Sequence, residues 1–418
     1  MSKFIIQGGK KLEGKIKVMG DKNSTLPILA ASLLTKGEII LENVPEIRDV
    51  STMLAILEHL GVKHKWLKSG VLLIDTKKIY YKDLLIDEVK HLRASIVLLG
   101  SALARFGKIK LHQPGGDVIG ARPVEVHING LKDLGVDIES NHTIEANFKK
   151  VYSKKIVLQE PSVTGTEVLI LFASLIPQET TLKLVATEPA VQNLCKFLQK
   201  LGVSIKGLGT PFLTIKGSKK LKTKIRHTIP SDTTEIATFC ALAGATKSNL
   251  EIYPIEIDYL DSLFFALDEA NLKYKILKGK LKIFSSKLKG IKKLQTGLYP
   301  KFLTDYQPPF GAMMTQANGV TLIHDWLYEN RLGYLNELAH MGASVEILDP
   351  HRAIIIGPTP LVGKEVKSMD IRAGISMVIA GLTAKGTTII YDAEKIDRGY
   401  EKIEERLKQI GARITREE

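Results

Sequence analysis

Lys36-Gly-Glu-Ile-Ile-Leu41 is the first of six short stretches that share one pattern, and this pattern decides the fold. In each stretch a polar turn ends an apolar, helix-like run and leads into a strand-like run. The later copies are Phe106-Gly-Lys-Ile-Lys-Leu111, Gln178-Glu-Thr-Thr-Leu-Lys183, Lys247-Ser-Asn-Leu-Glu-Ile252, Asn318-Gly-Val-Thr-Leu-Ile323 and Lys385-Gly-Thr-Thr-Ile-Ile390. A recurring helix–turn–strand pattern predicts an α/β protein built from copies of one repeat.

A second, amphipathic helix in each repeat ends at a residue suited to the left-handed backbone conformation. Glycine is the usual residue just after the last helical position, and asparagine is its usual substitute. The six helix ends are Leu60-Gly61, Leu134-Gly135, Leu201-Gly202, Ala270-Asn271, Met341-Gly342 and Ile410-Gly411. The same cap therefore recurs about every 70 residues.

The repeats favour two domains over an extended array. Each repeat mixes helices with strands, and the copies differ in their loops, so three repeats closing around buried helices, twice over, fit 418 residues better than a solenoid. A boundary is expected near Thr228-Ile-Pro230. We therefore expect a first domain over 22–229 and a second over 230–418.

Composition indicates an ordinary globular protein. Of the residues, 44% are hydrophobic and 25% are charged, and no apolar run is long enough to span a bilayer. Met1-Ser-Lys-Phe-Ile-Ile6 lacks the pattern of a signal peptide. Cys195 and Cys240 stand in apolar runs without metal-ligating neighbours, which indicates buried thiols. These features predict a soluble cytoplasmic protein without a metal or another cofactor.

The basic balance of the chain has two interpretations. The formal net charge is +14, which is typical of some nucleic-acid-binding proteins. However, the lysines are dispersed along the chain, and only 6% of residues are aromatic, which leaves little on which to stack bases. We favour a generally basic surface with an anionic small-molecule substrate, and expect neither nucleic acid nor a membrane as a partner. Oligomeric state is left open.

A glycine-rich stretch, Leu111-His-Gln-Pro-Gly-Gly-Asp-Val-Ile-Gly-Ala-Arg-Pro-Val-Glu-Val-His127, is the first candidate for function. Three glycines and a proline within seven residues exclude a regular element and allow the backbone to approach a ligand closely. Asp117 is able to exchange a proton, and Arg122 is able to hold an anion. The alternative is a plain surface turn.

Polar residues at helix starts are further candidates. Ser and Thr before a helix expected at Leu26 to Leu34 read as its N-cap, with Lys22 near the N-terminus, where anions bind well. Ser162-Val-Thr-Gly-Thr166 either grips a phosphate or sugar, or caps a helix. Asp232 and Glu235 are expected to cap another helix. Asp305 is either a cap or a general base, and spacing alone favours the cap.

Arginines recur at equivalent places in the repeats. Arg93 and Arg372 lie at repeat openings, and Arg122, Arg331 and Arg398 precede second helices. Arginines that converge in a cleft between the two domains would suit a multiply anionic substrate. No Walker or dinucleotide-binding glycine motif and no His/Cys cluster is present in the sequence, so redox and metal chemistry are disfavoured.

Taken together, the motifs resemble those of the enolpyruvyl transferases, in the family's order and over essentially the whole chain. The matching stretches are Lys22-Asn23 with Leu26-Pro27-Ile28, Arg93-Ala94-Ser95, Pro114-Gly115-Gly116-x-x-Ile119-Gly120-Ala121-Arg122-Pro123, Ser162-Val163-Thr164-Gly165-Thr166, Thr304-Asp305, Glu329-Asn330-Arg331 and Asp397-Arg398-Gly399-Tyr400-Glu401. The resemblance implies two inside-out α/β barrel domains, each of three βαβαββ-like repeats. It also implies an active site in the inter-domain cleft and an N-terminal segment, 1–21, that packs with the second domain.

The glycine-rich loop and the Asp-Arg-Gly-Tyr stretch resemble the branch of the family that acts on UDP-N-acetylglucosamine. This implies transfer of the enolpyruvyl group of phosphoenolpyruvate to the 3′-hydroxyl of that sugar nucleotide, with release of phosphate, as the first committed step of peptidoglycan synthesis. A paralogue with shikimate 3-phosphate or another nucleotide as acceptor is the alternative. Joint retention of the matched charged residues argues against a non-catalytic protein.

The resemblance also assigns roles to residues. Asp117 would be the acid on the moving loop, Asp305 would take the proton of the sugar hydroxyl, and Lys22 and Arg398 would act in catalysis. The residues implied to hold phosphoenolpyruvate are Lys22, Asn23, Arg122, Arg331, Arg372 and Arg398. The residues implied to hold the UDP-sugar are Asn23, Arg93, Arg122, Pro123, Val124, Glu125, Val126, Ser162, Val163, Thr164, Gly165, Asp305 and Leu327.

The chain departs from the family pattern in two functional places. Asp117 stands where the commonest members have a cysteine, and a carboxylate is a far poorer nucleophile than a thiolate. We therefore expect insensitivity to fosfomycin, which alkylates that cysteine. Ser231-Asp-Thr-Thr-Glu235 replaces the usual Asp-Arg-x-Glu, with no evident substitute arginine.

Substrate binding is expected to bring the loop from Pro114 to Ile119 over the cleft.

Overall fold

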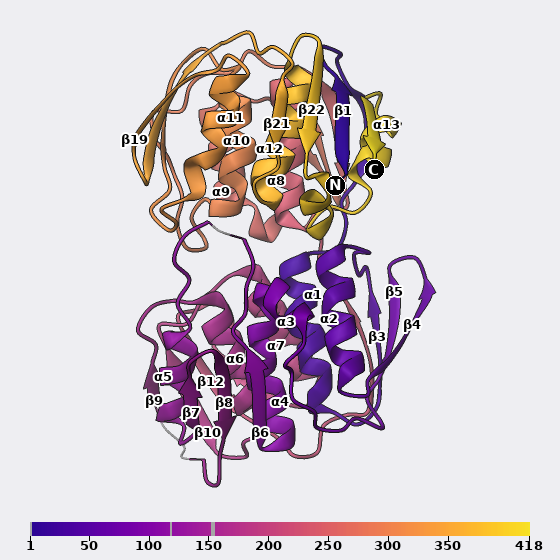
Figure 1. Cartoon of the computed structure of the whole chain (residues 1–418), viewed down its shortest axis with the longest axis vertical. Helices are drawn as coiled ribbons and strands as arrows, with labels where there is room; N and C mark the ends of the chain where they lie inside the picture. The colour runs from indigo at the N-terminus through magenta and orange to yellow at the C-terminus, as the bar shows by residue number, and fades with distance from the viewer. Residues whose placement is uncertain (1, 118, 152–154) are drawn as a thin grey trace. The chain divides into compact units, whose positions relative to one another are not determined.

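The computed structural model describes residues 2–117, 119–151 and 155–418. The chain forms two compact units (Figure 1). Unit 1 comprises Met1–Met19, Asp117–Ala121 and Ser231–Glu418, and unit 2 comprises Gly20–Gly116 and Arg122–Pro230. The chain thus starts in unit 1, builds unit 2 and returns.

Unit 2 contains three repeats, each with two longer helices and a small sheet, and one further short helix, Asp87–His91. Its helices are α1 (Lys22–Ala31), α2 (Arg48–His59), α3 (Asp87–His91), α4 (Leu98–Phe106), α5 (Glu125–Asp133), α6 (Val163–Ala173) and α7 (Pro189–Leu201). Its strands are β3 (Glu38–Glu42), β4 (Lys63–Lys68), β5 (Val71–Asp75), β6 (Lys108–His112), β7 (Asp137–Ser140), β8 (Thr143–Asn147), β9 (Lys155–Val157), β10 (Glu179–Lys183), β11 (Ser204–Lys206), β12 (Phe212–Lys216) and β13 (Lys224–Thr228). The sheets have the orders β13-β3-β5-β4, β6-β8-β7 and β11-β12-β10-β9.

Unit 1 repeats this design. Its helices are α8 (Thr233–Ala245), α9 (Asp261–Glu269), α10 (Gln307–Met314), α11 (Tyr334–His340), α12 (Ile371–Thr383) and α13 (Ile403–Gln409). Its strands are β1 (Lys3–Gln7), β2 (Glu13–Lys17), β14 (Asn249–Tyr253), β15 (Tyr274–Leu277), β16 (Lys280–Ile283), β17 (Leu294–Gln295), β18 (Gly319–His324), β19 (Ser344–Asp349), β20 (Arg352–Gly357), β21 (Glu365–Lys367), β22 (Thr387–Tyr391) and β23 (Arg413–Glu417). The sheets have the orders β15-β16-β14-β2, β17-β18-β20-β19 and β21-β22-β1-β23.

A parallel pair of strands in most sheets shows how the chain closes each unit. In four repeats the parallel partner precedes the first helix, as β9, β17, β21 or the single bridge from Leu84 to Leu111. In the first repeat the partner is β13, with Lys224 opposite Glu38, and in the fourth it is β2, with Glu13 opposite Asn249. The chain passes from one unit to the other just after β2 and just after β13. These two strands therefore complete the sheets of the fourth and the first repeat.

The first helices of the repeats form the cores. Every residue of α10 is buried, as are Ser24–Ala31 of α1 and Thr234–Ala245 of α8. Because these helices are apolar on all sides, they are stable only when surrounded by other elements. Within each unit of Figure 1 the sheets lie outside such helices. The predicted six repeats and the inside-out α/β fold are confirmed.

The predicted helix ends are also confirmed. Gly61, Gly135, Gly202, Gly342 and Gly411 have φ between 85° and 110°, and Asn271 has φ of 54°. A side chain with a β-carbon is strained in this conformation, so the cap residues reflect a backbone requirement.

The predicted start of the first helix is wrong. α1 begins at Lys22 rather than Leu26, because the Asp21 carboxylate accepts hydrogen bonds from Asn23 N and Ser24 N at 3.3 and 2.7 Å. Asp21 stands three and four residues before Ser24 and Thr25, the hydroxyl residues proposed as caps, and its carboxylate satisfies the orphan N–H groups instead. The regular helix ends at Ala31, and a 3₁₀ turn, Ser32–Leu34, follows.

Candidate functional site

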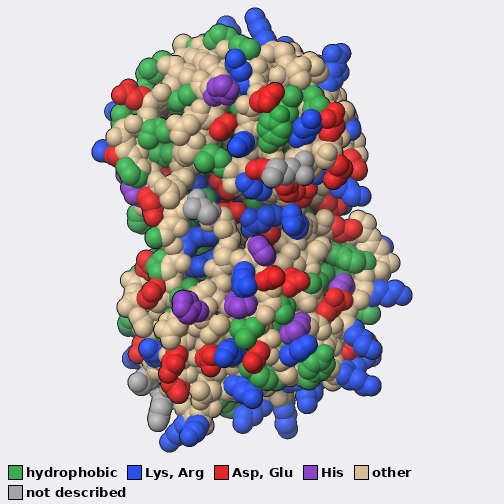
Figure 2. Space-filling model, viewed as in Figure 1, with side chains coloured by type: hydrophobic (Ala, Val, Ile, Leu, Met, Phe, Trp, Pro, Cys, Tyr) green, Lys and Arg blue, Asp and Glu red, His purple; other side chains and the backbone are tan. Residues whose placement is uncertain are grey.

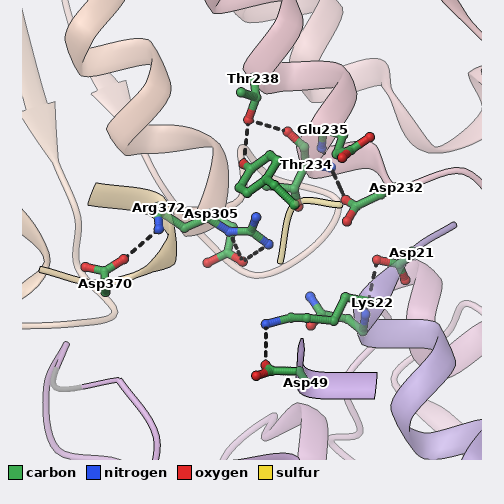
Figure 3. A network of polar contacts seen from close by, with 12 residues as sticks. Asp21, Lys22, Asp49, Asp232, Thr234, Glu235, Thr238, Asp305, Asp370 and Arg372 are labelled. Carbon is green, nitrogen blue, oxygen red and sulfur yellow. Dashed lines mark hydrogen bonds and ion pairs between the residues drawn. The ribbon is translucent and has the colours of Figure 1, made fainter. Parts of the chain in front are cut away.

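Lys22, its cap Asp21 and Asp49 form what we call the Lys22 cluster, in unit 2 (Figure 3). Lys22 is the first residue of α1, and its Nζ lies 3.1 Å from Oδ2 of Asp49, the second residue of α2. The two side chains are 11% and 5% exposed. The start of α1 thus presents one cation, which one carboxylate holds in place. Asn23, the next residue, is exposed.

Asp305, Arg372 and Asp370, which Figure 3 labels, form the Asp305 cluster in unit 1 together with Arg331. Arg331 Nη2 lies 2.6 Å from Asp305 Oδ1, and Arg372 Nε and Nη2 each lie 3.0 Å from Oδ2. Asp305 is 30% exposed at its side chain, whereas the arginines are 2% and 3% exposed. The favoured prediction of an N-cap at Asp305 is therefore wrong, because two buried arginines bind its carboxylate.

The arginines of this cluster remain charged. Burial lowers the pKa of Arg331, but the carboxylates of Asp305 and Asp370 more than offset this and raise it above its ordinary value. Burial likewise lowers the pKa of Arg372, and Tyr400 and Asp305 outweigh that effect. Within the described part of the chain, Arg331 Nε and Arg372 Nη1 are buried and donate to no acceptor.

Backbone elements place the arginines of the cluster. Asp370 caps α12 by accepting from Arg372 N at 2.7 Å and Ala373 N at 3.1 Å. Arg331 opens the 3₁₀ turn Arg331–Gly333, ahead of α11. Just before it, Asp325 accepts from Leu327 N at 3.2 Å and from the Thr304 hydroxyl at 2.6 Å. The backbone at Leu327 is therefore tied to the residue that precedes Asp305.

The glycine-rich loop has a stem in unit 2. The Arg93 guanidinium donates to the carbonyl oxygens of Pro114 at 3.4 Å and Pro123 at 3.3 Å, and to that of Arg122. A β-carbon at Gly115 would lie 1.8 Å from the Lys90 carbonyl oxygen, so only glycine fits there. Arg93 thus holds both ends of the loop together.

The loop's acidic residue, Asp117, forms an ion pair with Arg398 within unit 1. Their side chains are 19% and 17% exposed. Ala121, nearer the end of the loop, donates its N–H to Glu329 at 2.7 Å. The closing loop expected from Pro114 to Ile119 includes Val118, which lies outside the described residues.

The segments expected to hold the UDP-sugar lie at two helix starts in unit 2. Ser162 is the N-cap of α6, and its hydroxyl accepts from Gly165 N at 3.2 Å. Pro123 and Val124 form the turn that leads into Glu125, the first residue of α5. Ser162 is thus a helix cap, and the phosphate- or sugar-binding interpretation of this stretch stays a prediction.

Asp232 and Glu235, in the altered Ser231–Glu235 stretch of the fourth repeat, are both predicted to cap a helix, and only Asp232 does so. Asp232 caps α8, with Thr234 N at 2.7 Å and Glu235 N at 3.2 Å. Glu235 is not a cap: it binds the two Nη atoms of Arg406, each at 2.7 Å, and accepts from Met19 N. Sequence reasoning missed Arg406, because nothing local links a residue of α13 to one of α8.

Sequence reasoning also missed two polar contacts in which at least one side chain is buried. The hydroxyl groups of Thr238 and Tyr400 lie 2.8 Å apart in unit 1. In unit 2, His127 of α5 reaches the Thr164 hydroxyl at 2.9 Å. Buried polar atoms of this kind are not distinguishable from core residues in one sequence, since only the fold supplies their partners.

On the face shown in Figure 2, basic side chains are distributed over both units and interspersed with acidic ones. Among the described residues, no group of three or more His, Cys, Asp or Glu is placed to hold a metal ion.

Burial raises the pKa of both cysteine thiols, that of Cys195 to about 12. Within the part of the chain that the structure describes, no helix is both long and apolar enough to cross a bilayer.

Comparisons with known proteins identify the family. Residues 6–407 match the family model of EPSP synthase (3-phosphoshikimate 1-carboxyvinyltransferase). UDP-N-acetylglucosamine 1-carboxyvinyltransferase 1 of Caldanaerobacter subterraneus subsp. tengcongensis is 40% identical over 418 residues, covering 99% of both chains. The enzyme of that name from Treponema denticola is 38% identical over the full length of both chains.

Solved structures show the same fold. The enolpyruvyl transferase NikO from Streptomyces tendae superposes with a TM-score of 0.90 at 21% identity, over 100% of this chain and 99% of that one. EPSP synthase from Acinetobacter baumannii superposes with a TM-score of 0.79 at 20% identity, over the full length of both. The chain therefore belongs to the EPSP synthase family.

Proposed function

We propose that this protein transfers the enolpyruvyl group of phosphoenolpyruvate to the 3′-hydroxyl of UDP-N-acetylglucosamine, with release of phosphate. This is the first committed step of peptidoglycan synthesis. The observation that carries the proposal is similarity over nearly the full length, at 40% and 38% identity, to relatives that bear the name of this activity. Both substrates are cytoplasmic metabolites, so we place the reaction in the cytoplasm.

The chemistry requires positive charge and two proton-transfer groups. Protonation at C3 of phosphoenolpyruvate makes C2 electrophilic, and the sugar 3′-oxygen adds to C2 to give a tetrahedral intermediate. Loss of phosphate and of a proton from C3 restores the double bond. Cations stabilise the phosphate and carboxylate, while an acid and a base act on C3 and on the hydroxyl.

The residues proposed to hold phosphoenolpyruvate are mainly cations. They are Lys22, with Asn23 beside it, Arg122 and Arg398. Lys22 suits the role because Asp49 fixes its Nζ at the start of α1, where the helix dipole favours an anion. The buried pair Arg331 and Arg372 contributes support from within the Asp305 cluster.

Asp305 takes the proton of the sugar hydroxyl. Its side chain is the most exposed member of the cluster, and the two buried arginines orient its carboxylate. A base held in one orientation acts without a reorganisation cost when the hydroxyl attacks C2.

Asp117 supplies the acid at C3. It lies on the glycine-rich loop and pairs with Arg398, the cation proposed to bind phosphoenolpyruvate. Binding of the substrate anion to Arg398 would compete with this ion pair and release the carboxylate, which takes up a proton from solvent, delivers it to C3 and takes a proton back from C3 when phosphate leaves. Arg398 therefore acts both in substrate binding and in catalysis.

The UDP-sugar is held by the starts of α5 and α6 and by the loop stem. The Val163 and Thr164 N–H groups at the start of α6 suit a diphosphate, because Ser162 occupies only Gly165 N. Pro123–Val126 and Arg122 lie at the start of α5, next to Arg93. Asn23, Asp305 and the backbone at Leu327 complete the set.

The experiment measures phosphate release from phosphoenolpyruvate with UDP-N-acetylglucosamine, with shikimate 3-phosphate and without an acceptor. Release with the UDP-sugar alone, lost on Asp305→Ala, is the expected result. Release with shikimate 3-phosphate instead would overturn the acceptor assignment and indicate that the altered Ser231–Glu235 stretch has changed the substrate. Circular dichroism establishes that each protein is folded.

A further inference from the structure

His127 joins the two backbone segments proposed to hold the UDP part of the acceptor. It is the third residue of α5, and 1% of its surface is exposed. Its Nε2 lies 2.9 Å from the Thr164 hydroxyl at the start of α6, and its Nδ1 lies 3.2 Å from the Val124 carbonyl oxygen, just before α5. One imidazole ring therefore contacts both segments.

The chemistry of the partners settles which ring nitrogen carries the proton. A carbonyl oxygen only accepts, so Nδ1 donates its N–H to Val124. Burial, assisted by the Arg93 charge, lowers the pKa of His127 to about 4, so the ring is neutral near pH 7 and has a single N–H. Nε2 is then an acceptor, and the Thr164 hydroxyl must donate to it.

Packing brings the same two segments into direct contact. A β-carbon at Gly165 would lie 3.0 Å from Val126 Cγ1, so the starts of α5 and α6 approach closely at this point. The contact fixes the separation of the helix starts but not the rotation of the Thr164 side chain. The hydrogen bond to His127 supplies that second restraint.

We propose that His127 is a positioning residue for the UDP-sugar, which holds the turn before α5 against the start of α6 and directs the Thr164 hydroxyl proton away from the ligand. Thr164 then offers a ligand its backbone N–H and an oxygen that only accepts. The inference deepens the proposed function and rests on it. The competing interpretation is a core histidine that contributes to stability alone.

Four variants separate these interpretations. His127→Phe keeps a ring of similar volume but removes both hydrogen bonds, and His127→Gln restores one donor and one acceptor. Thr164→Val removes the hydroxyl from the other side. His227→Phe is the matched control, because His227 is also buried in unit 2, has its pKa lowered to about 4 by burial, and bonds to Asn193 at 3.0 Å.

Binding of UDP-N-acetylglucosamine is measured by titration calorimetry, the KM for phosphoenolpyruvate by phosphate release, and the melting temperature by calorimetry. We expect His127→Phe and Thr164→Val to weaken UDP-sugar binding about tenfold, the effect of one lost orienting hydrogen bond. The KM for phosphoenolpyruvate stays within about twofold, and His127→Gln recovers most of the affinity. His227→Phe lowers the melting temperature and leaves the affinity unchanged.

The inference is overturned if His127→Phe binds the UDP-sugar as the wild type does, or if His227→Phe weakens binding equally. If the wild-type protein itself does not bind UDP-N-acetylglucosamine, the proposed function fails, and this inference fails with it. Because that result comes from the wild type alone, the two failures are distinguishable.

Discussion

The Lys22 cluster and the Asp305 cluster have a similar local design with charge in different proportions. In each, an aspartate caps a central helix and a basic residue follows within two positions, as Lys22 directly after Asp21 and Arg372 two residues after Asp370. In unit 2 one cation faces one carboxylate, Asp49, whereas in unit 1 two arginines share the carboxylate of Asp305. The cap therefore does not determine which charge the site presents.

The start of α8 extends the comparison. Asp232 caps this helix as Asp21 caps α1, but no cation follows, and Glu235 is buried against Arg406. The two caps also make equivalent backbone hydrogen bonds. Asp21 N donates to the Pro230 carbonyl oxygen at 2.8 Å, and Asp232 N donates to the Met19 carbonyl oxygen at 2.9 Å. Equivalent backbone positions thus serve substrate binding in one unit, as we propose, and stability in the other.

The largest effect is expected at the Asp305 cluster. Asp305→Asn keeps the shape of the side chain but removes the base and the charge that two arginines share. Phosphate release should fall about 10²- to 10⁴-fold, the usual contribution of a general base. Circular dichroism and the melting temperature serve as the controls for an intact fold. Retained turnover would show that this carboxylate only anchors the arginines.

Removal of the Lys22 cation should have the next largest effect. Lys22→Met is expected to reduce phosphate release about 10²- to 10³-fold, the cost of losing one group that stabilises developing charge. Asp49→Asn is the matched variant: it keeps the cation and loosens it, so a rise in the KM for phosphoenolpyruvate should dominate. Equal losses in the two variants would place the importance of the pair in folding instead.

The ion pair between Asp117 and Arg398 gives a third, qualitative test. The wild-type enzyme should lose no activity on incubation with fosfomycin, whereas the Asp117→Cys variant should be inactivated with time. Fosfomycin is an epoxide, and a thiolate attacks an epoxide far faster than a carboxylate does. Mass spectrometry locates the adduct. An adduct at residue 117 of the wild-type protein would contradict the expectation.

At the start of α8 the expected effect is on stability. Glu235→Ala leaves Arg406 buried without its charged partner, which should destabilise unit 1 by about 3–5 kcal/mol. The shift of the urea midpoint measures this. Glu235→Ala combined with Arg406→Met should recover part of the loss, and failure to do so would mean that the pair matters through its bond to Met19.

The smallest effects distinguish the two caps. Asp21→Ala and Asp232→Ala should each cost about 0.5–2 kcal/mol, the value of an N-cap. Only Asp21→Ala is expected to reduce activity as well, because Lys22 is the next residue. Unfolding midpoints and phosphate release are measured on both variants. A parallel loss of activity in Asp232→Ala would weaken the contrast drawn between these helix starts.

The sequence by itself determined the repeats, their helix ends and the inside-out α/β fold, together with the residues proposed for the site. These depend on local features: apolar periodicity, and caps such as Gly61 and Asn271 whose backbone conformation suits few residues. Motif resemblance singled out Lys22, Asp305 and the arginines because these residues stand in recognisable short stretches of sequence.

Only the tertiary structure decided what these charged side chains bind. Spacing favoured a cap at Asp305, yet Arg331 of the same repeat and Arg372 of the next repeat hold its carboxylate, and an arginine 171 residues away binds Glu235. A charged group is stabilised by whichever opposite charge the fold brings within a few ångströms, and sequence separation does not enter that energy. The partners of His127 and Asp305 became known only when the helices were packed.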